Sequence, residues 1–188
     1  MKQTLILVTG SPAAGKTTLA TKISERLDIP VFARDRITEV LWDAPAPGEK
    51  VPNQFGPASV EIIFHIIEQF MKSHCSLIIE SYWNYNLVND RLVKLKEKYN
   101  YNTITFRLFG KPEILYQRFY AREKTSERHE GLKGVPQMTL DQFIAKIERT
   151  GCDKIDIGGT TIDIDTSDFN NMNMEQIIRD IKKYSSTK

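Results

Sequence analysis

Eight consecutive residues near the amino terminus combine the residue types that bind a phosphate chain. The segment Gly10-Ser11-Pro12-Ala13-Ala14-Gly15-Lys16-Thr17 matches the pattern G-x-x-x-x-G-K-[ST] at every fixed position. The glycines let the backbone bend so that successive N–H groups point at phosphate oxygens. Lys16 supplies a positive charge for the β- and γ-phosphates, and the Thr17 hydroxyl can bind Mg²⁺. We therefore predict a nucleoside triphosphate site at this segment.

The residues on either side of the segment provide the context that the pattern requires. Residues 4–9 are short, apolar and rich in β-formers, which predicts a strand buried on both faces. From Lys16 onward, apolar residues recur on one helical face, and the start of a helix adds the positive end of its dipole. The alternative is a glycine-rich turn that carries Lys-Thr by chance, and motif and context together disfavour it.

Two carboxylates follow predicted strands. Asp35 comes after the strand predicted at 30–33, and Glu80 lies at the end of the strand predicted at 76–81. The carboxyl ends of parallel strands face the nucleotide crevice, so both side chains are expected near the γ-phosphate. Asp35 could orient an attacking hydroxyl and take its proton, or it could merely cap the next helix. Glu80 could hold Mg²⁺ through water or bind the acceptor, or it could be an edge carboxylate paired with an arginine.

A cluster of cations lies further along the chain. Arg118 and Arg122 are four residues apart and share one helix face. Cations that close over a triphosphate neutralise charge as the phosphoryl group moves, although a solvated helix end is the alternative. The polar segment 122–135 contains two glycines, which predicts a mobile lid. We interpret His129 as a surface residue of this lid rather than a base.

Five aromatic residues cluster in sequence around the two carboxylates. Some of them must belong to the core, and others could stack on an acceptor or a nucleobase. They are Trp42, Phe55, Tyr82, Trp83 and Tyr85.

Strand and helix patterns alternate from end to end. This alternation predicts a parallel sheet wrapped by helices on both faces, in a single domain over residues 1–188. We expect strands at 4–9, 30–33, 76–81, 102–109 and 160–164. We expect helices starting near 16, 35 and 112, and helices at 60–71, 87–99, 139–150 and 174–184. Residues 43–59 hold four of the eight prolines, and we interpret them as an ordered excursion on the acceptor side.

Composition excludes several classes of protein. Of 188 residues, 40% are hydrophobic and 27% charged, which is typical of a globular chain. The net charge of +2 lacks the basic excess of a duplex-DNA binder, although a local basic groove remains possible. Cys75 and Cys152 form no metal-binding pair and are expected to be reduced thiols. Without a long apolar run or a signal peptide, we expect a cytoplasmic protein that has no membrane partner.

A switch GTPase is also disfavoured. Such a protein reads guanine with N-K-x-D, and the nearest match is Asp153-Lys154-Ile155-Asp156, which has the wrong first residue.

The chain resembles the small P-loop kinases of the AAA-domain type, relatives of chloramphenicol phosphotransferase, zeta toxins and the 5′-kinase domain of polynucleotide kinase. The resemblance rests on the phosphate-binding segment, on Asp35-Arg36, on Arg118 to Arg122 before Arg128-His129, and on Asp165-Thr166-Ser167. It implies a three-layer α/β/α P-loop NTPase fold with a helical lid and a five-stranded parallel sheet in the order 2-3-1-4-5. It also implies ATP and Mg²⁺ as cofactors.

The resemblance assigns roles to individual residues. The residue matching Asp35 is the usual base for the acceptor hydroxyl, and Arg118 and Arg122 match lid arginines that touch ATP. The loop matching Asp165-Thr166-Ser167 helps to wrap the adenine. Glu80 stands where the family often has Asp, so its metal role is less certain than that of Thr17. The nucleotide-binding set is then Gly10, Ser11, Ala13, Ala14, Gly15, Lys16, Thr17, Thr18, Arg118, Thr166 and Ser167. The acceptor-binding set is Asp35, Arg36, Glu80 and Trp83.

The function expected from these residues is an ATP-dependent kinase. It would phosphorylate a hydroxyl of a small molecule or nucleotide, and the family does not name the acceptor because its members use very different ones. One alternative is a polynucleotide 5′-hydroxyl kinase, which needs a basic groove beside Asp35. The other is an ATP-binding regulatory protein that has no acceptor.

Overall fold

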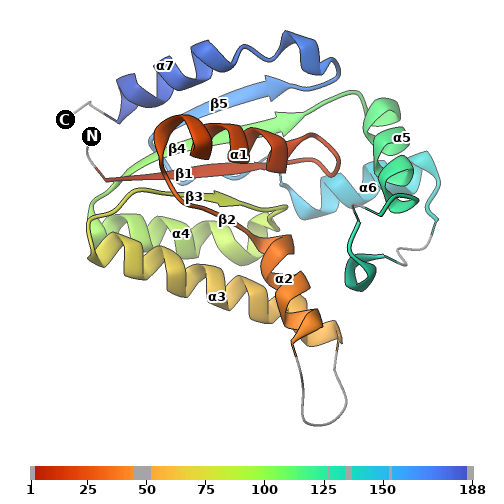
Figure 1. The fold of residues 1–188 in the computed structure, drawn as a ribbon, viewed down its shortest axis with the longest axis horizontal. Helices are drawn as coiled ribbons and strands as arrows, with labels where there is room; N and C mark the ends of the chain where they lie inside the picture. Colours follow the sequence, from red (N-terminus) through yellow and green to blue (C-terminus); the bar gives the residue numbers. More distant parts are fainter. Residues whose placement is uncertain (1–2, 45–51, 127, 134–136, 153, 186–188) are drawn as a thin grey trace.

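The computed structural model describes residues 3–44, 52–126, 128–133, 137–152 and 154–185 (Figure 1). Five strands form one parallel sheet in the order β2-β3-β1-β4-β5, which confirms the predicted topology. The strands are β1 (Thr4–Gly10), β2 (Val31–Ala33), β3 (Leu77–Glu80), β4 (Asn102–Phe109) and β5 (Thr160–Asp165).

The central strand β1 divides the hydrophobic core into two halves. All seven of its residues are buried, because β3 and β4 flank it and helices cover both faces. Successive side chains point to opposite faces, so Ile6 and Val8 pack in one half while Leu5 and Leu7 pack in the other. The apolar run at residues 4–9 therefore forms the buried strand that the sequence predicts.

The helices complete a three-layer α/β/α arrangement, as expected (Figure 1). On one face lie α1 (Lys16–Leu27) and α7 (Met174–Tyr184), whose apolar residues pack with Ile6 and Val8. On the other face lie α3 (Pro52–Lys72) and α4 (Tyr85–Tyr99), which pack with Leu5 and Leu7.

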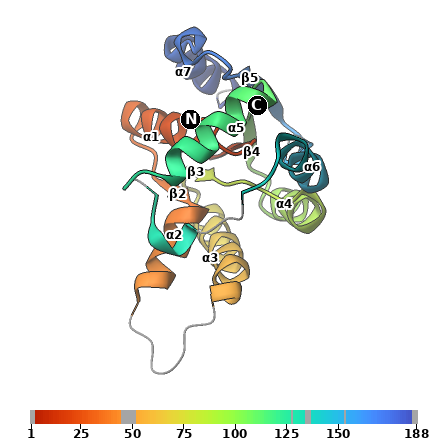
Figure 2. The same cartoon turned by 90° about the vertical axis from the view of Figure 1, so that its right-hand side faces the viewer.

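The remaining helices gather at the carboxyl end of the sheet, as Figures 1 and 2 show from two sides. They are α2 (Arg34–Asp43), α5 (Pro112–Glu123), α6 (Leu140–Thr150) and the two short 3₁₀ helices η1 (Glu130–Leu132) and η2 (Phe169–Asn171). Since α2 follows directly from β2, and β3 ends nearby, the two candidate carboxylates come to the same edge of the sheet.

One helix is longer than predicted. The sequence suggests a helix from residue 60, but α3 begins at Pro52, so residues 52–59 of the expected excursion are helical. Proline at the start of a helix loses no hydrogen bond, because the first N–H groups have no partner within the helix. Pro57 lies inside α3, where such a residue usually breaks a helix, which explains the wrong boundary. Residues 45–51 of the excursion lie outside the described ranges.

No helix in the described part of the chain is both long enough and apolar enough to cross a bilayer.

Candidate active site

The loop between β1 and α1 needs glycine at both ends. Gly10 has a φ of +121°, and a side chain there would overlap the backbone carbonyl of Leu108 in β4. Gly15 has a φ of +81°, and a Cβ there would lie 2.5 Å from the Phe169 ring. The Ser11 N–H donates to the Leu108 carbonyl at 2.9 Å, which ties the loop to the sheet. The loop therefore keeps the bent backbone that the phosphate-binding pattern predicts.

Lys16 is held inside this loop. Its ammonium donates to the Ser11 carbonyl at 2.8 Å, and the residue is only 9% exposed. Burial lowers the pKa of Lys16, while the nearby carboxylates of Glu80 and Asp35 act in the opposite direction. A buried cation with one neutral partner is poised to bind the charged oxygens of a phosphate chain.

Thr17 and Glu80 bring two side-chain oxygen atoms together beside the phosphate-binding loop. The Thr17 hydroxyl donates to a carboxylate oxygen of Glu80 at 3.0 Å. Burial raises the pKa of Glu80, although the charge of Lys16 opposes the shift. Mg²⁺ is usually held by one or two protein oxygens while it keeps several waters, and these two donors fit that requirement. Glu80 is therefore hydrogen-bonded to a threonine rather than paired with an arginine.

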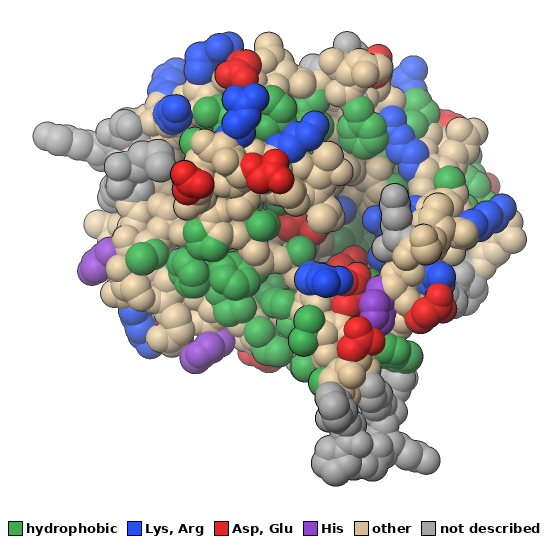
Figure 3. All heavy atoms as spheres, in the orientation of Figure 1, with side chains coloured by type: hydrophobic (Ala, Val, Ile, Leu, Met, Phe, Trp, Pro, Cys, Tyr) green, Lys and Arg blue, Asp and Glu red, His purple; other side chains and the backbone are tan. Residues whose placement is uncertain are grey.

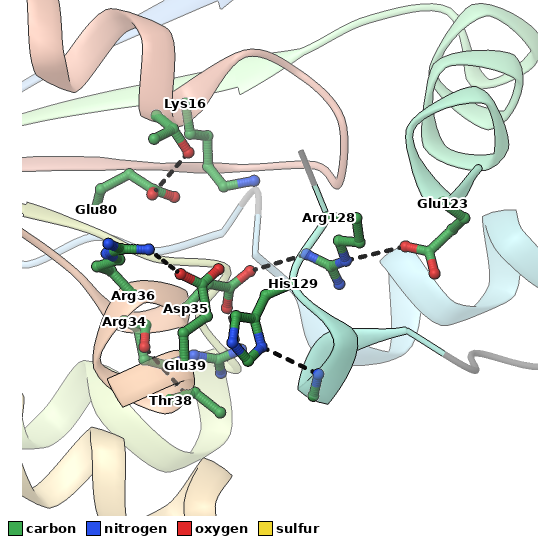
Figure 4. A network of polar contacts seen from close by, with 12 residues as sticks. Lys16, Arg34, Asp35, Arg36, Thr38, Glu39, Glu80, Glu123, Arg128 and His129 are labelled. Carbon is green, nitrogen blue, oxygen red and sulfur yellow. Dashed lines mark hydrogen bonds and ion pairs between the residues drawn. The ribbon is translucent and has the colours of Figure 1, made fainter. Parts of the chain in front are cut away.

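Asp35 lies in a network of arginines, as Figure 4 shows. The guanidinium of Arg34 contacts one carboxylate oxygen at 3.1 Å, and that of Arg128 lies 3.6 Å from the other. Arg128 in turn pairs with Glu123 at 3.0 Å. Burial alone would raise the pKa of Asp35, but the two arginines and Lys16 outweigh it and lower the pKa. The carboxylate is therefore ionised at neutral pH, as a proton acceptor must be.

Asp35 does not cap the helix that follows it. The N-cap residue of α2 is Ala33, and no side chain makes the capping hydrogen bond. Asp35 lies within the first turn, and its side chain contacts the arginines instead. The alternative role that the sequence leaves open for this residue is therefore not realised.

These groups line one cavity of about 450 Å³. In Figure 3 the surface is hollowed near the middle, with acidic and basic side chains at the rim of the hollow. Of the predicted site residues, the cavity brings together Ala13, Gly15, Lys16, Thr17, Thr18, Asp35, Glu80, Arg118 and Arg122.

Arg118 links α5 to the loop after β5. Its guanidinium donates to the carbonyl of Thr166 at 2.6 Å and to that of Ser167 at 3.0 Å. The guanidinium also lies 4.0 Å from the centre of the Phe169 ring. Thr166 and Ser167 thus contact Arg118 through their backbone, and Phe169 brings the same loop against Gly15.

Two predicted acceptor-binding residues are outside the cavity lining. Trp83 is only 1% exposed and packs against Phe64 in the core, with ring centres 6.2 Å apart. Arg36 is exposed and pairs with Glu39 at 2.8 Å. The structure therefore does not bring either side chain to Asp35.

Sequence reasoning missed three residues that do line the cavity: Arg34, Lys146 and Phe169. Arg34 is adjacent to Asp35 in the sequence, and this adjacency to a predicted site residue already indicated a place in the site. Lys146 comes from α6, more than a hundred residues away, and only the tertiary fold places it here. Phe169 follows the predicted loop 165–167 by two residues, so a longer window would have included it.

Of the predicted lid, residues 122–126 lie at the end of α5 and directly after it, and residues 128–133 pack against α2. The His129 ring accepts the Gly131 N–H at Nδ1 over 3.0 Å, so Nε2 carries the proton and donates to the Asp43 carboxylate at 3.1 Å. A Cβ on Gly131 would lie 2.5 Å from the Trp42 indole. His129 thus binds the lid to α2, which suits the surface role expected for it. Residues 127, 134 and 135 lie outside the described ranges.

Comparisons with known proteins bear on the family and the fold of the chain. A family model described as an AAA domain matches residues 5–150. None of the curated proteins compared with the chain matches it by sequence.

Three solved structures show the same fold. A kinase candidate from Chloroflexus aurantiacus has a TM-score of 0.85 at 24% identity, covering 98% of this chain and 99% of its own. Kti12 from Chaetomium thermophilum, solved with ADP-AlF3, has a TM-score of 0.65 at 14% identity and coverage of 97% and 100%. Shikimate kinase from Acinetobacter baumannii, solved with shikimate, has a TM-score of 0.60 at 16% identity and coverage of 100% and 96%.

Proposed function

The chain belongs to the AAA domain family, and from this premise we propose that it is an ATP-dependent phosphotransferase. It moves the γ-phosphate of ATP to a hydroxyl group of a small molecule or nucleotide. One observation carries the proposal: the ionised carboxylate of Asp35 lines the same cavity as the phosphate-binding loop. A protein that only binds ATP has no need of a proton acceptor at that place.

The nucleotide end of the cavity is suited to a triphosphate. Backbone N–H groups of Ala13, Gly15, Lys16 and Thr17 and the Lys16 ammonium would hold the phosphates, with Arg118 and Arg122 beside them. A neighbouring cleft of about 230 Å³ could take the adenine between apolar and small side chains. It is lined by Gly15, Thr18, Lys22, Phe169, Met172 and Met174. Thr17 and Glu80 would hold Mg²⁺, which when bound neutralises charge on the β- and γ-phosphates.

Asp35 lies at the other end of the cavity, the acceptor end, where it takes part in the transfer step. It accepts a hydrogen bond from the acceptor hydroxyl and so aims the oxygen at the γ-phosphorus. The new O–P bond forms as the bond from the γ-phosphorus to the β–γ bridging oxygen breaks, and ADP leaves. The hydroxyl proton passes to the Asp35 carboxylate, which releases it to solvent afterwards. Lys16 and the arginines stabilise the charge on the moving phosphoryl group.

The fold comparisons support a small acceptor, because a neighbour with the same fold was solved with shikimate. The described part of the lid packs on α2 beside Asp35, which narrows the acceptor end further. Both features favour an acceptor that enters a cavity over one that lies along a groove.

The test is acceptor-dependent release of ADP, screened against pools of metabolites, antibiotics and oligonucleotides. The proposal predicts release with a small hydroxyl compound, recovery of its phosphate ester, and loss of both in the Lys16→Ala variant. Release with oligonucleotides alone would make the protein a polynucleotide 5′-kinase. ATP binding without acceptor-dependent release in any pool would favour the regulatory protein.

A further inference from the structure

The cavity carries more positive charge than its proposed nucleotide needs. Among the described residues that line it, six are cationic and two are acidic: Lys16, Arg34, Arg118, Arg122, Arg128 and Lys146 against Asp35 and Glu80. The excess is four charges, or three if Glu123, the partner of Arg128, is included. ATP with one Mg²⁺ carries about two negative charges. One or two positive charges are therefore left without a counter-ion in an enclosed site.

The surplus positive charge lies at the acceptor end of the cavity rather than at the nucleotide end. Lys16 and Arg118 are tied to the phosphate-binding loop and to the loop after β5. Arg34 and Arg128 share the single carboxylate of Asp35. Among the described residues, the Nε of Arg34 is buried and has no hydrogen-bond partner. Arg34 contacts Asp35 through Nη2 and lines the cavity, so its other guanidinium N–H groups can donate to a further acceptor without releasing Asp35.

Lys146 is the clearest unmatched cation. Within the described ranges its ammonium takes part in no hydrogen bond or ion pair and lies 5.9 Å from the centre of the Phe119 ring. Burial, Arg149 and Arg128 lower the pKa of Lys146, while Glu123 alone opposes them. A lysine that faces like charges in a cavity is stabilised when an anion binds beside it.

The position of Lys146 is set by the fold. The Tyr82 hydroxyl lies 2.6 Å from the Thr150 hydroxyl one turn further along α6 and joins that helix to the end of β3. Phe143, one turn before Lys146, is fully buried in the core. The helix begins with a complete capping box at Thr139. These contacts hold α6 so that Lys146 lines the cavity.

We propose that the phosphate acceptor carries an anionic group, a carboxylate or a phosphate, and that Lys146 and Arg34 bind this group. The inference rests on the proposed phosphotransferase function, because it names the substrate class of the same site. It places the anionic group beside Lys146 and leaves the acceptor hydroxyl with Asp35. Neutral sugars and polyols would then be poor substrates compared with their acidic counterparts.

The first experiment measures anion binding without any reaction. The protein is saturated with Mg²⁺ and a non-hydrolysable ATP analogue, so that the nucleotide end is occupied. Sulfate or malonate is then added at 10 mM, in about tenfold excess over a millimolar Kd, with sodium chloride at equal ionic strength as the reference. We expect an increase in Tm of about 3 °C from at least one of the two anions. Sulfate represents a phosphate group and malonate a carboxylate, so the two arms distinguish these sources.

Two matched variants test the residue assignment. Lys146→Met removes the charge but keeps the stem, and it should lose at least half of the Tm increase. Lys94→Met makes the same change at an exposed lysine of α4 outside the cavity lining, and it should keep the full increase. An equal increase in Lys146→Met and the parent, or no increase in the parent, would overturn the inference.

The second experiment compares acceptors that differ only in charge. Release of ADP is measured with glycerol, glycerate and glycerol 3-phosphate, and with glucose, gluconate and glucose 6-phosphate, before the wider pools. The inference predicts that active acceptors are acidic. It also predicts that Lys146→Met raises the KM for these acceptors by about 10- to 100-fold, while the KM for ATP stays within about threefold of the parent value. A neutral acceptor used as well as its acidic counterpart would overturn the inference while the kinase proposal stands. If no pool supports transfer, the kinase proposal fails, and the Tm experiment still decides whether the anion site exists.

Discussion

The two ends of the cavity are built in different ways. The phosphate-binding part of the nucleotide end is one continuous turn, residues 10–18, whose shape depends on Gly10 and Gly15, which neighbouring backbone and ring atoms leave no room to replace. The acceptor end is assembled from side chains on α2, on the segment after β3, around η1 and on α6. A side chain in place of Gly10 or Gly15 would distort the backbone. A substitution at the acceptor end changes side-chain contacts and needs no change of the backbone.

This difference explains how one fold can serve different acceptors. The bent loop supplies the same N–H groups whatever the rest of the chain contains. The side chains at the other end can be exchanged one at a time, so the acceptor can change while the phosphate chemistry stays the same. The predictions below test whether the two ends are as independent as their construction suggests.

The largest effect is expected for Asp35→Asn. The amide cannot take the hydroxyl proton, so acceptor phosphorylation should fall by roughly 10²- to 10⁴-fold. The affinity for ATP should stay within a few-fold of the parent, because Asp35 belongs to the acceptor end. Both quantities can be measured on one preparation, by product formation and by calorimetric titration.

A control for this variant exists on the same helix. Glu39→Gln changes an acidic residue of α2 that pairs with Arg36 away from the cavity, and it should leave the rate near that of the parent. Full transferase activity in Asp35→Asn would remove Asp35 as the base and make Glu80 the next candidate.

Lys16→Ala should affect both steps at the nucleotide end. Loss of a positioned charge on the phosphates should lower the rate by roughly 10²-fold or more and weaken ATP binding as well. The combined loss would distinguish Lys16 from Asp35, whose variant keeps its affinity for ATP. Lys94→Ala is the matched control on an exposed helix. Unchanged rate and affinity in a folded Lys16→Ala protein would contradict the assignment of the phosphate-binding loop.

The same contrast explains how far the sequence allowed prediction. The strands, their order and the loop after β1 follow from local patterns and from a resemblance that rests on those patterns. Lys16, Thr17 and Asp35 lie where strand ends and a helix start must place them. Local rules are sufficient where neighbouring residues build the structure.

Prediction was least successful where distant segments meet. Lys146 carries no local signal, because an α6 lysine looks the same whether it faces solvent or a cavity. Trp83 is adjacent to Tyr82 in the segment after β3, yet the Trp83 side chain lies in the core and the Tyr82 side chain lines the cavity. The start of α3 at Pro52 depends on its packing against α2 and overrides the local preference of Pro57. These positions depend on tertiary contacts that spacing alone does not contain.

Phe169→Ala should have a moderate effect confined to the nucleotide end. The ring contacts Gly15 and stacks on Arg118, so its loss should weaken binding of an ATP analogue by about 3- to 10-fold. The KM for the acceptor should not change. Phe109 is equally exposed, at 42%, but lies outside the cavity lining, so Phe109→Ala serves as the control in the same titration. Equal losses in the two variants would show that Phe169 has no specific role.

The smallest effect concerns the lid, which lies between the two ends. The His129–Asp43 pair is partly exposed and fixes the described part of the lid to α2. Ala in place of Asp43 removes the acceptor of the His129 Nε2–H, whereas Asn would keep one. Exposed contacts of this kind contribute about 0.2–1 kcal/mol, so Asp43→Ala should speed amide exchange at residues 131–133 by about 1.5- to 5-fold. Adding ATP and Mg²⁺ should slow exchange there in both proteins, because a lid that closes over the phosphates gains contacts from its arginines. Glu39→Gln, on the same helix but away from the lid pair, should exchange like the parent. If the amides of residues 128–133 are strongly protected from exchange, and equally so with and without nucleotide, this segment does not move when nucleotide binds. The nucleotide end and the acceptor end of the cavity would then influence each other only through the bound substrates.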